Sequence, residues 1–171
     1  MCYFLYIASP LTLSEVRSMV PDGITVDLAD PVEQQILKSS SRGVQTVARL
    51  LVGRCSCDFV RQRHADPRED ERHLRERFRQ RGIGRDLTIS GLERHRAGAK
   101  VPVPAQGWPR ALVDFVHEHA RNAGRTVYQL AFLPPSSALR HETPLREVKL
   151  SRVTPELESW LDEGPPVAIT R

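Results

Sequence analysis

The stretch VQTVARLLVGRCSCD, residues 44–58, decides which fold this chain adopts. Its first nine residues are rich in β-branched side chains, which favours a strand, although their apolar spacing also fits a helix. We predict a strand over residues 44–52, with Gly53 marking a bulge or kink just before the cysteine pair Cys55 and Cys57. A strand at this position makes the chain a mixed α+β protein.

Strands and helices alternate on both sides of this stretch. Residues 2–8 form an apolar run that ends at a Ser-Pro pair, and residues 24–28 alternate apolar and polar side chains, so both are predicted strands. Further strands are predicted at 126–133 and 145–153, and helices at 12–19, 66–81, 86–97 and 109–123, with a short helix after residue 154. The core order of strand, helix, strand, strand, helices, strand is that of a ferredoxin-like α+β sandwich. We expect a ferredoxin-like antiparallel sheet with helices on one face and extra C-terminal elements, in a single domain, 1–171, that carries an Arg-rich helical insertion at 61–100.

The three cysteines of the chain are predicted to meet at one end of this sheet. In a ferredoxin-like sheet the first strand is central and antiparallel to the third, so Cys2 at the start of one lies beside Cys55 and Cys57 at the end of the other. In a regular strand, residues i and i+2 point to the same face with Cα atoms roughly 6.5 Å apart. The two sulfurs could then bind one soft metal ion at about 2.3 Å. The predicted ligands are Cys2, Cys55 and Cys57, with His64 or water as the fourth, and three thiolates suit zinc or copper(I).

Two other interpretations of the cysteines stay open. Cysteine is among the most buried residue types, so all three could be apolar core residues. Alternatively, Cys55 or Cys57 is a nucleophile, activated by the positive charge of Arg54 or Arg61 and with His64 as its base. The sequence carries no further catalytic signature and no nucleotide-binding motif, so the reaction of such an enzyme is not indicated.

The positive charge of the chain is concentrated in residues 61–100. This segment holds 12 of the 25 Lys and Arg residues but 7 of the 21 Asp and Glu residues, and the net charge of the whole chain is +4. Arginines could contact nucleic-acid phosphates or an acidic protein partner. The candidate contacts are Arg72, Arg75, Arg79, Arg81 and Arg85. Acidic residues are interleaved with them and only 6% of the chain is aromatic, so a solvated, ion-paired helix face is the simpler interpretation.

The composition is that of an ordinary globular protein. The chain has 171 residues, 40% of them hydrophobic and 27% charged, which suits one domain with a core of its own. No segment approaches the roughly 20 apolar residues needed to span a membrane, and the first apolar run lacks the features of a signal peptide. We therefore expect a cytoplasmic protein with no membrane partner, whose cysteines are thiols or metal ligands rather than disulfides.

Overall fold

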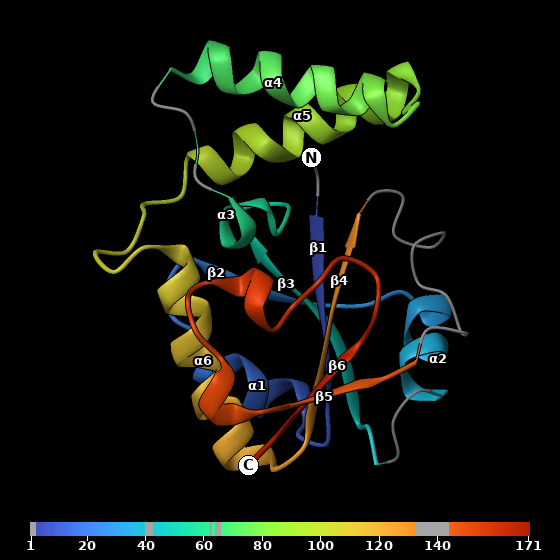
Figure 1. The fold of residues 1–171 in the computed structure, drawn as a ribbon, viewed down its shortest axis with the longest axis vertical. Helices are drawn as coiled ribbons and strands as arrows, with labels where there is room; N and C mark the ends of the chain where they lie inside the picture. Colours follow the sequence, from blue (N-terminus) through green and yellow to red (C-terminus); the bar gives the residue numbers. More distant parts are fainter. Residues whose placement is uncertain (1–2, 40–42, 62, 64–65, 133–143) are drawn as a thin grey trace.

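The computed structural model describes residues 3–39, 43–61, 63, 66–132 and 144–171. These residues form a six-stranded sheet with the strand order β2-β3-β1-β4-β6-β5 (Figure 1). The strands are β1 (Tyr3–Ser9), β2 (Ile24–Leu28), β3 (Thr46–Val52), β4 (Thr126–Phe132), β5 (Arg146–Lys149) and β6 (Val167–Thr170). Neighbouring strands are antiparallel except for β5 and β6, which are parallel. This mostly antiparallel sheet, together with the helices, confirms the predicted α+β class.

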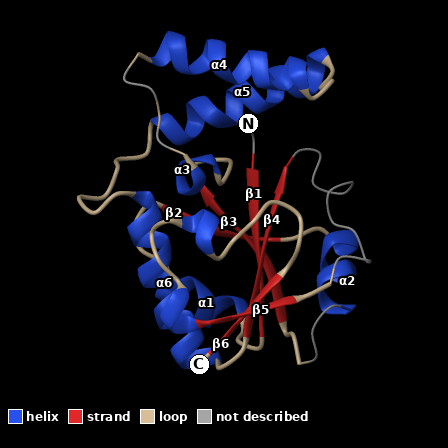
Figure 2. Cartoon of the chain, viewed as in Figure 1, coloured by secondary structure: helices blue, strands red, loops and turns tan. Residues whose placement is uncertain are grey.

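Six α-helices accompany the sheet in the described residues (Figure 2). They are α1 (Leu13–Met19), α2 (Pro31–Ser39), α3 (Cys57–Val60), α4 (Pro67–Gln80), α5 (Arg85–Ala99) and α6 (Trp108–Ala123). Two single-turn 3₁₀ helices, η1 (Leu150–Arg152) and η2 (Leu157–Ser159), lie between β5 and β6. None of the described helices combines the length and apolar character that crossing a membrane requires.

Strand β1 lies at the centre of the sheet, antiparallel to both β3 and β4. In this register Leu5 is opposite Leu50 of β3 and Leu130 of β4. All seven residues of β1 are buried, because both of its faces are covered. The strand predicted for residues 44–52 is confirmed as β3, and so is its antiparallel pairing with the first strand.

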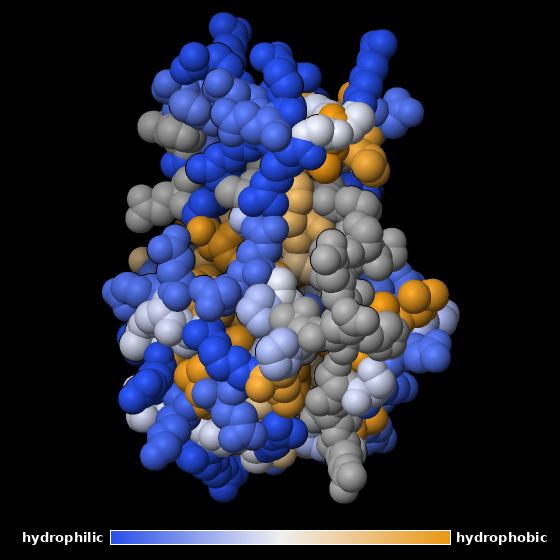
Figure 3. All heavy atoms as spheres, turned by 45° about the vertical axis from the view of Figure 1, so that its right-hand side comes forward, coloured by the Kyte–Doolittle hydropathy of each residue, from blue (hydrophilic) through white to orange (hydrophobic). Residues whose placement is uncertain are grey.

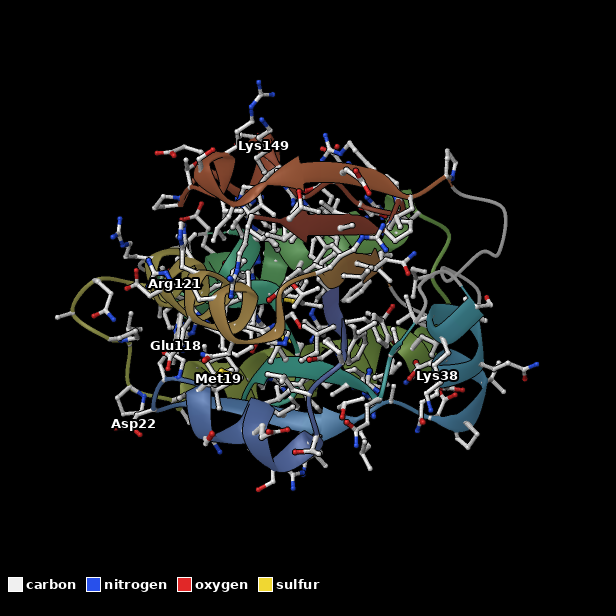
Figure 4. The ribbon with its side chains drawn as sticks, turned by 90° about the horizontal axis from the view of Figure 1, so that it is seen from below. Met19, Asp22, Lys38, Glu118, Arg121 and Lys149 are labelled. Atoms are coloured by element: carbon white, nitrogen blue, oxygen red, sulfur yellow. The ribbon has the colours of Figure 1, made fainter. Side chains whose placement is uncertain are left out.

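The helices cover both faces of the sheet, which differs from the predicted arrangement on one face. Ser9 of β1 is hydrogen-bonded to His119 of α6, whereas Tyr6 of β1 is hydrogen-bonded to Glu33 of α2. Residues an odd number apart in a strand point to opposite faces, so α6 and α2 lie on opposite sides of β1. Figures 1 and 4 show α1 and α6 on one side and α2 on the other. The connection from β2 to β3 is therefore a helix that buries Ile36 and Leu37 against the second face.

Helices α4 and α5 form a hairpin at the end of the sheet where β1 begins (Figure 1). Asp66 caps α4 by accepting a hydrogen bond from the backbone of Arg68, as its N-cap position predicts. The narrow apolar stripe of α4 consists of Leu74 and Phe78, and the Phe78 ring lies 6.2 Å from that of Phe132 on β4. Glycine at position 91 of α5 allows the Phe78 ring to pack closely against this helix. A Cβ at residue 91 would lie only 2.5 Å from the ring. The hairpin thus packs on the sheet through a small apolar contact.

Candidate functional site

The segment that follows β3 is joined to the start of β1 by hydrogen bonds. The backbone N–H of Ser56 donates to the Tyr3 carbonyl at 2.8 Å, and the Ser56 hydroxyl accepts from the Leu5 N–H at 2.7 Å. The Tyr3 N–H donates to Sγ of Cys57 at 3.4 Å. The start of the first strand therefore lies beside the end of the third, as predicted. Cys2, which precedes Tyr3 in the chain, and His64 are outside the described residues.

Cys55 and Cys57 do not continue the strand, which corrects the geometry predicted for the pair. The chain turns at Gly53, whose φ is +66°, and the Val52 N–H then donates to the Cys55 carbonyl at 2.8 Å. Helix α3 begins at Cys57, so the i, i+2 rule for a strand does not place the two sulfurs on one face. Gly53 permits this turn, and a Cβ at Gly53 would lie 2.6 Å from the backbone of Gly98 on α5.

Both described thiols are inside the protein. Cys55 and Cys57 are 0% exposed and belong to the hydrophobic core. Among residues 3–39, 43–61, 63, 66–132 and 144–171, no three His, Cys, Asp or Glu side chains are placed to hold a metal ion. Two of the four predicted ligands, Cys2 and His64, lie outside these ranges, so the complete predicted site is not described.

A buried cluster of charged side chains lies next to Cys57. Arg63 binds Asp58 with two hydrogen bonds of 2.5 and 2.7 Å, and Arg61 binds Asp70 with two of 2.7 and 3.3 Å. His95 joins the two pairs, because its Nε2 lies 2.6 Å from Asp70 and both arginines lie within 3.3 Å of its ring nitrogens. Asp58, Asp70 and His95 are buried. The cluster connects α3 to both helices of the hairpin.

Charged groups of this cluster lie within electrostatic range of Cys57. Burial lowers the pKa of His95, and the positive charges of Arg63 and Arg61 lower it further. For Arg61, burial alone would lower the pKa, but the hydrogen bond and charge of Asp70 raise it. Negative charge on Cys57 would raise the pKa of both His95 and Arg61, so Cys57 is within electrostatic range of the two. The Cys57 sulfur therefore has the Tyr3 N–H as a hydrogen-bond donor and Arg61 as a charged neighbour, and Arg61 is itself paired with Asp70.

Arg61 also lines the hollows around α3. One cleft of about 740 Å³ is lined by Arg61, Arg63 and Asp58 together with apolar side chains such as Trp108 and Pro155. A second hollow of about 420 Å³ contains Arg61, Tyr3 and Glu163. The Tyr3 hydroxyl donates to Glu163 at 3.0 Å, and burial with the charge of Glu163 raises the pKa of Tyr3. Arg61 thus belongs both to the buried cluster and to the surface of the cleft.

The five arginines predicted as nucleic-acid contacts divide into two groups. Arg72, Arg75 and Arg79 line a hollow of about 490 Å³ on the outward side of α4, a part of the surface where hydrophilic residues predominate (Figure 3). Arg81 binds Glu163 at 2.9 Å and stacks on the Phe132 ring, and Arg85 is the exposed first residue of α5. Arg72 and Arg75 are themselves ion-paired, with Glu69 at 3.1 Å and with Glu71 at 3.9 Å.

Of the charged residues in the buried cluster, Arg61 was expected beside the cysteines as an activating charge, whereas Arg63, Asp70 and His95 were not predicted as site residues. Asp70 lies four and eight positions before Leu74 and Phe78, so it shares their helix face and interrupts an apolar stripe. An acidic residue in such a stripe indicates a buried, paired charge, because unpaired charges are rarely buried. His95 gives a weaker signal, since it is three positions after the buried Leu92 of the same helix.

Comparison of this chain with protein-family models, with curated proteins and with solved structures finds no match. The features of the described residues that bear on function are therefore the surroundings of Cys57 and the arginines of the hairpin.

Proposed function

We propose that this protein binds a soft metal ion, zinc or copper(I), at a thiol centre formed by Cys57, Cys55 and Cys2. The hydrogen bond from the Tyr3 N–H to Cys57 Sγ, at 3.4 Å, is the observation that carries this proposal. This hydrogen bond joins Tyr3, the residue that follows Cys2 in the chain, to a sulfur of the Cys-x-Cys pair. His64 or a water molecule is the proposed fourth ligand.

Two features of the surroundings of Cys57 support a charged sulfur. A metal-binding cysteine must be a thiolate, and hydrogen bonds and positive charges favour that form. Cys57 has a backbone N–H donor 3.4 Å away and lies within electrostatic range of Arg61. We place the protein in the cytoplasm, where thiols stay reduced and available to a metal.

A nucleophilic role for Cys57 or Cys55 has weaker support. Both thiols are 0% exposed, whereas a catalytic thiol must meet its substrate. His95, the histidine of the buried cluster, contacts Asp70 through Nε2 and Arg61 through Nδ1. With both ring nitrogens beside charged partners, His95 is poorly placed to act as a base for a thiol.

Metal analysis of protein purified without chelator tests the metal proposal. We expect one equivalent of zinc or copper per chain, and less than a tenth of that in Cys57→Ser and in Cys2→Ser. His64→Gln separates a histidine ligand from water, since the variant loses affinity only in the first case. Thermal unfolding of each metal-free variant shows whether the fold survives. Wild-type protein that takes up no metal when zinc or copper(I) is supplied would overturn the proposal.

The outward side of α4 supports a second candidate, a binding module for nucleic acid or an acidic protein. Three of the predicted arginines share one hollow there, which presents several cations to one ligand. We expect binding to random duplex DNA that weakens steeply as salt increases. The triple variant of Arg72, Arg75 and Arg79 to Ala should lose this binding. A control triple variant of the exposed arginines Arg110, Arg125 and Arg152 should keep it, and equal loss in both would rule out a specific α4 surface.

A further inference from the structure

Two arginines approach the ring of Phe4 from different parts of the fold. The guanidinium carbon of Arg49, on β3, lies 5.9 Å from the ring centroid, and that of Arg94, on α5, lies 5.8 Å from it. Arg49 is opposite Tyr6 in the β1–β3 register and shares the sheet face of Phe4 and Tyr6, the face that α2 covers. The Phe4 ring and the two arginines therefore lie where the sheet meets the helical hairpin.

Each of these arginines has a buried nitrogen that lacks a hydrogen-bond acceptor. They are Nε of Arg49 and Nη1 of Arg94. Such buried donors are rare in folded proteins, and each one calls for an explanation. The hydrogen bond of Arg49 is a long one, from Nη2 to the Leu28 carbonyl at 3.4 Å. Two donors without acceptors near one ring indicate that an acceptor group belongs at this place.

Acidic residues lie near the two guanidinium groups but do not pair with them in the described residues. In the described part of the chain, neither Arg49 nor Arg94 takes part in an ion pair. Glu33 is buried, and its carboxylate accepts hydrogen bonds from the Tyr6 hydroxyl at 2.5 Å and from the Asp30 N–H at 3.0 Å. Asp27 is opposite Arg49 in the β2–β3 register, but it is exposed and forms no ion pair there. Contact with the Phe4 ring attracts each cation only weakly.

We propose that Arg49 and Arg94 together bind an oxyanion, the carboxylate or phosphate group of a small molecule, beside Phe4. Guanidinium groups match this ligand class, because their N–H donors form a planar fork that pairs with two oxygen atoms. An oxyanion would accept hydrogen bonds from Arg49 Nε and Arg94 Nη1. A carboxylate would offset one of the two positive charges, and a doubly ionised phosphate group would offset both. The site uses none of the cysteines and does not depend on the metal proposal.

Calorimetric titration with inorganic phosphate and with acetate, at constant ionic strength in chloride, tests this inference. We expect saturable binding of at least one of them and a rise in Tm with its concentration. Binding to phosphate alone indicates a phosphate-bearing ligand, and binding to acetate alone a carboxylate. Arg49→Gln and Arg94→Gln should each weaken binding at least tenfold, whereas Arg110→Gln, at an exposed arginine on α6, should not change it.

Arg94→Lys gives a second test if Arg49→Gln, within a central strand pair, does not fold. It keeps the charge and lies on a helix of the hairpin, so we expect a folded protein with weaker binding because the fork is lost. Absence of saturable binding to both anions by the wild-type protein would overturn the inference. Unchanged binding in Arg94→Gln would also overturn it.

Discussion

Nε2 of His95, on α5, lies 2.6 Å from a carboxylate oxygen of Asp70, on α4, and both side chains are buried. Through this contact the helical hairpin shares one charged cluster with Arg61 and Arg63, the residues that follow α3. The hairpin and the segment that carries Cys57 are therefore coupled electrostatically, in addition to the apolar contact of Phe78 with Phe132.

Asp70→Asn should destabilise the protein by about 3 kcal/mol, because it leaves the half-buried Arg61 without its charge partner. The matched control is Glu71→Gln on the same helix, which removes the surface ion pair with Arg96, whose side chain is 52% exposed. That change should cost less than about 1 kcal/mol. Urea unfolding of the two variants measures both values, and equal destabilisation would contradict a structural role for the buried cluster.

Gly98→Ala should disturb the same cluster from the backbone side. A Cβ at residue 98 would lie 2.7 Å from Nη2 of Arg63 and 2.8 Å from a carboxylate oxygen of Asp58. Crowding of this kind costs about 1–3 kcal/mol. Gly84→Ala at the N-terminus of the same helix has open space around its Cβ and should change stability little. Similar Tm values for the two variants would show that the Asp58–Arg63 pair can move aside.

His119 should make stability depend on pH. It is fully buried between the hydroxyls of Ser9 and Tyr128, and burial lowers its pKa from 6.5 to about 4. Between these two values the unfolded chain binds more protons than the folded one, so stability falls as the pH falls. The expected loss from this residue between pH 7 and pH 5 is about 2 kcal/mol. Urea unfolding at the two pH values measures this loss.

His119→Gln is the control for this pH dependence. Glutamine keeps polar atoms in the position of the imidazole but does not titrate in this range, so the variant should lose less stability than wild type on going from pH 7 to pH 5. An identical pH profile in the variant would assign the effect to another group, with His95 as the first residue to examine, because burial also lowers its pKa.

The strand assignments could be predicted where the apolar pattern and the turn residues agree. Residues 2–8, 24–28, 44–52 and 126–133 correspond to β1, β2, β3 and β4, since their apolar runs are bounded by proline, glycine or serine. Strand β6 was missed because Val167–Thr170 is only four residues long. The pair Asp30-Pro31 permits a helix at the position of α2 but does not require one, so the sequence does not predict that a helix covers the second sheet face.

The candidate site could be predicted only in part, because much of it depends on contacts between segments that are distant in sequence. The pairing of β1 with β3 follows from strand order, and it brings Tyr3 to Cys57. The kink at Gly53 was expected, but the start of α3 at Cys57 does not follow from the sequence, because α5 packs against that turn from a segment distant in sequence. The Arg61–Asp70–His95 contacts likewise join three elements whose relative placement no local pattern specifies.

Thiol labelling distinguishes the three interpretations of the cysteines. We expect iodoacetamide to label Cys55 and Cys57 slowly in the native protein, because both are 0% exposed. Chelator should accelerate labelling if a metal protects the sulfurs, and should change nothing if they are core residues. Mass spectrometry of digested protein gives the rate for each cysteine. Rapid labelling of one cysteine without chelator would favour the nucleophilic interpretation.

The central claim is that Cys57, Cys55 and Cys2 bind one metal ion, and substitution with cobalt(II) tests it most directly. Sulfur-to-cobalt charge-transfer absorption arises only when thiolates coordinate the ion, and its intensity grows with their number. We predict this absorption at one equivalent of cobalt in the wild-type protein, weaker in Cys2→Ser and in Cys55→Ser, and unchanged in the surface variant Glu71→Gln. A wild-type spectrum without charge-transfer absorption, or one that Cys2→Ser and Cys57→Ser leave unchanged, would contradict the account.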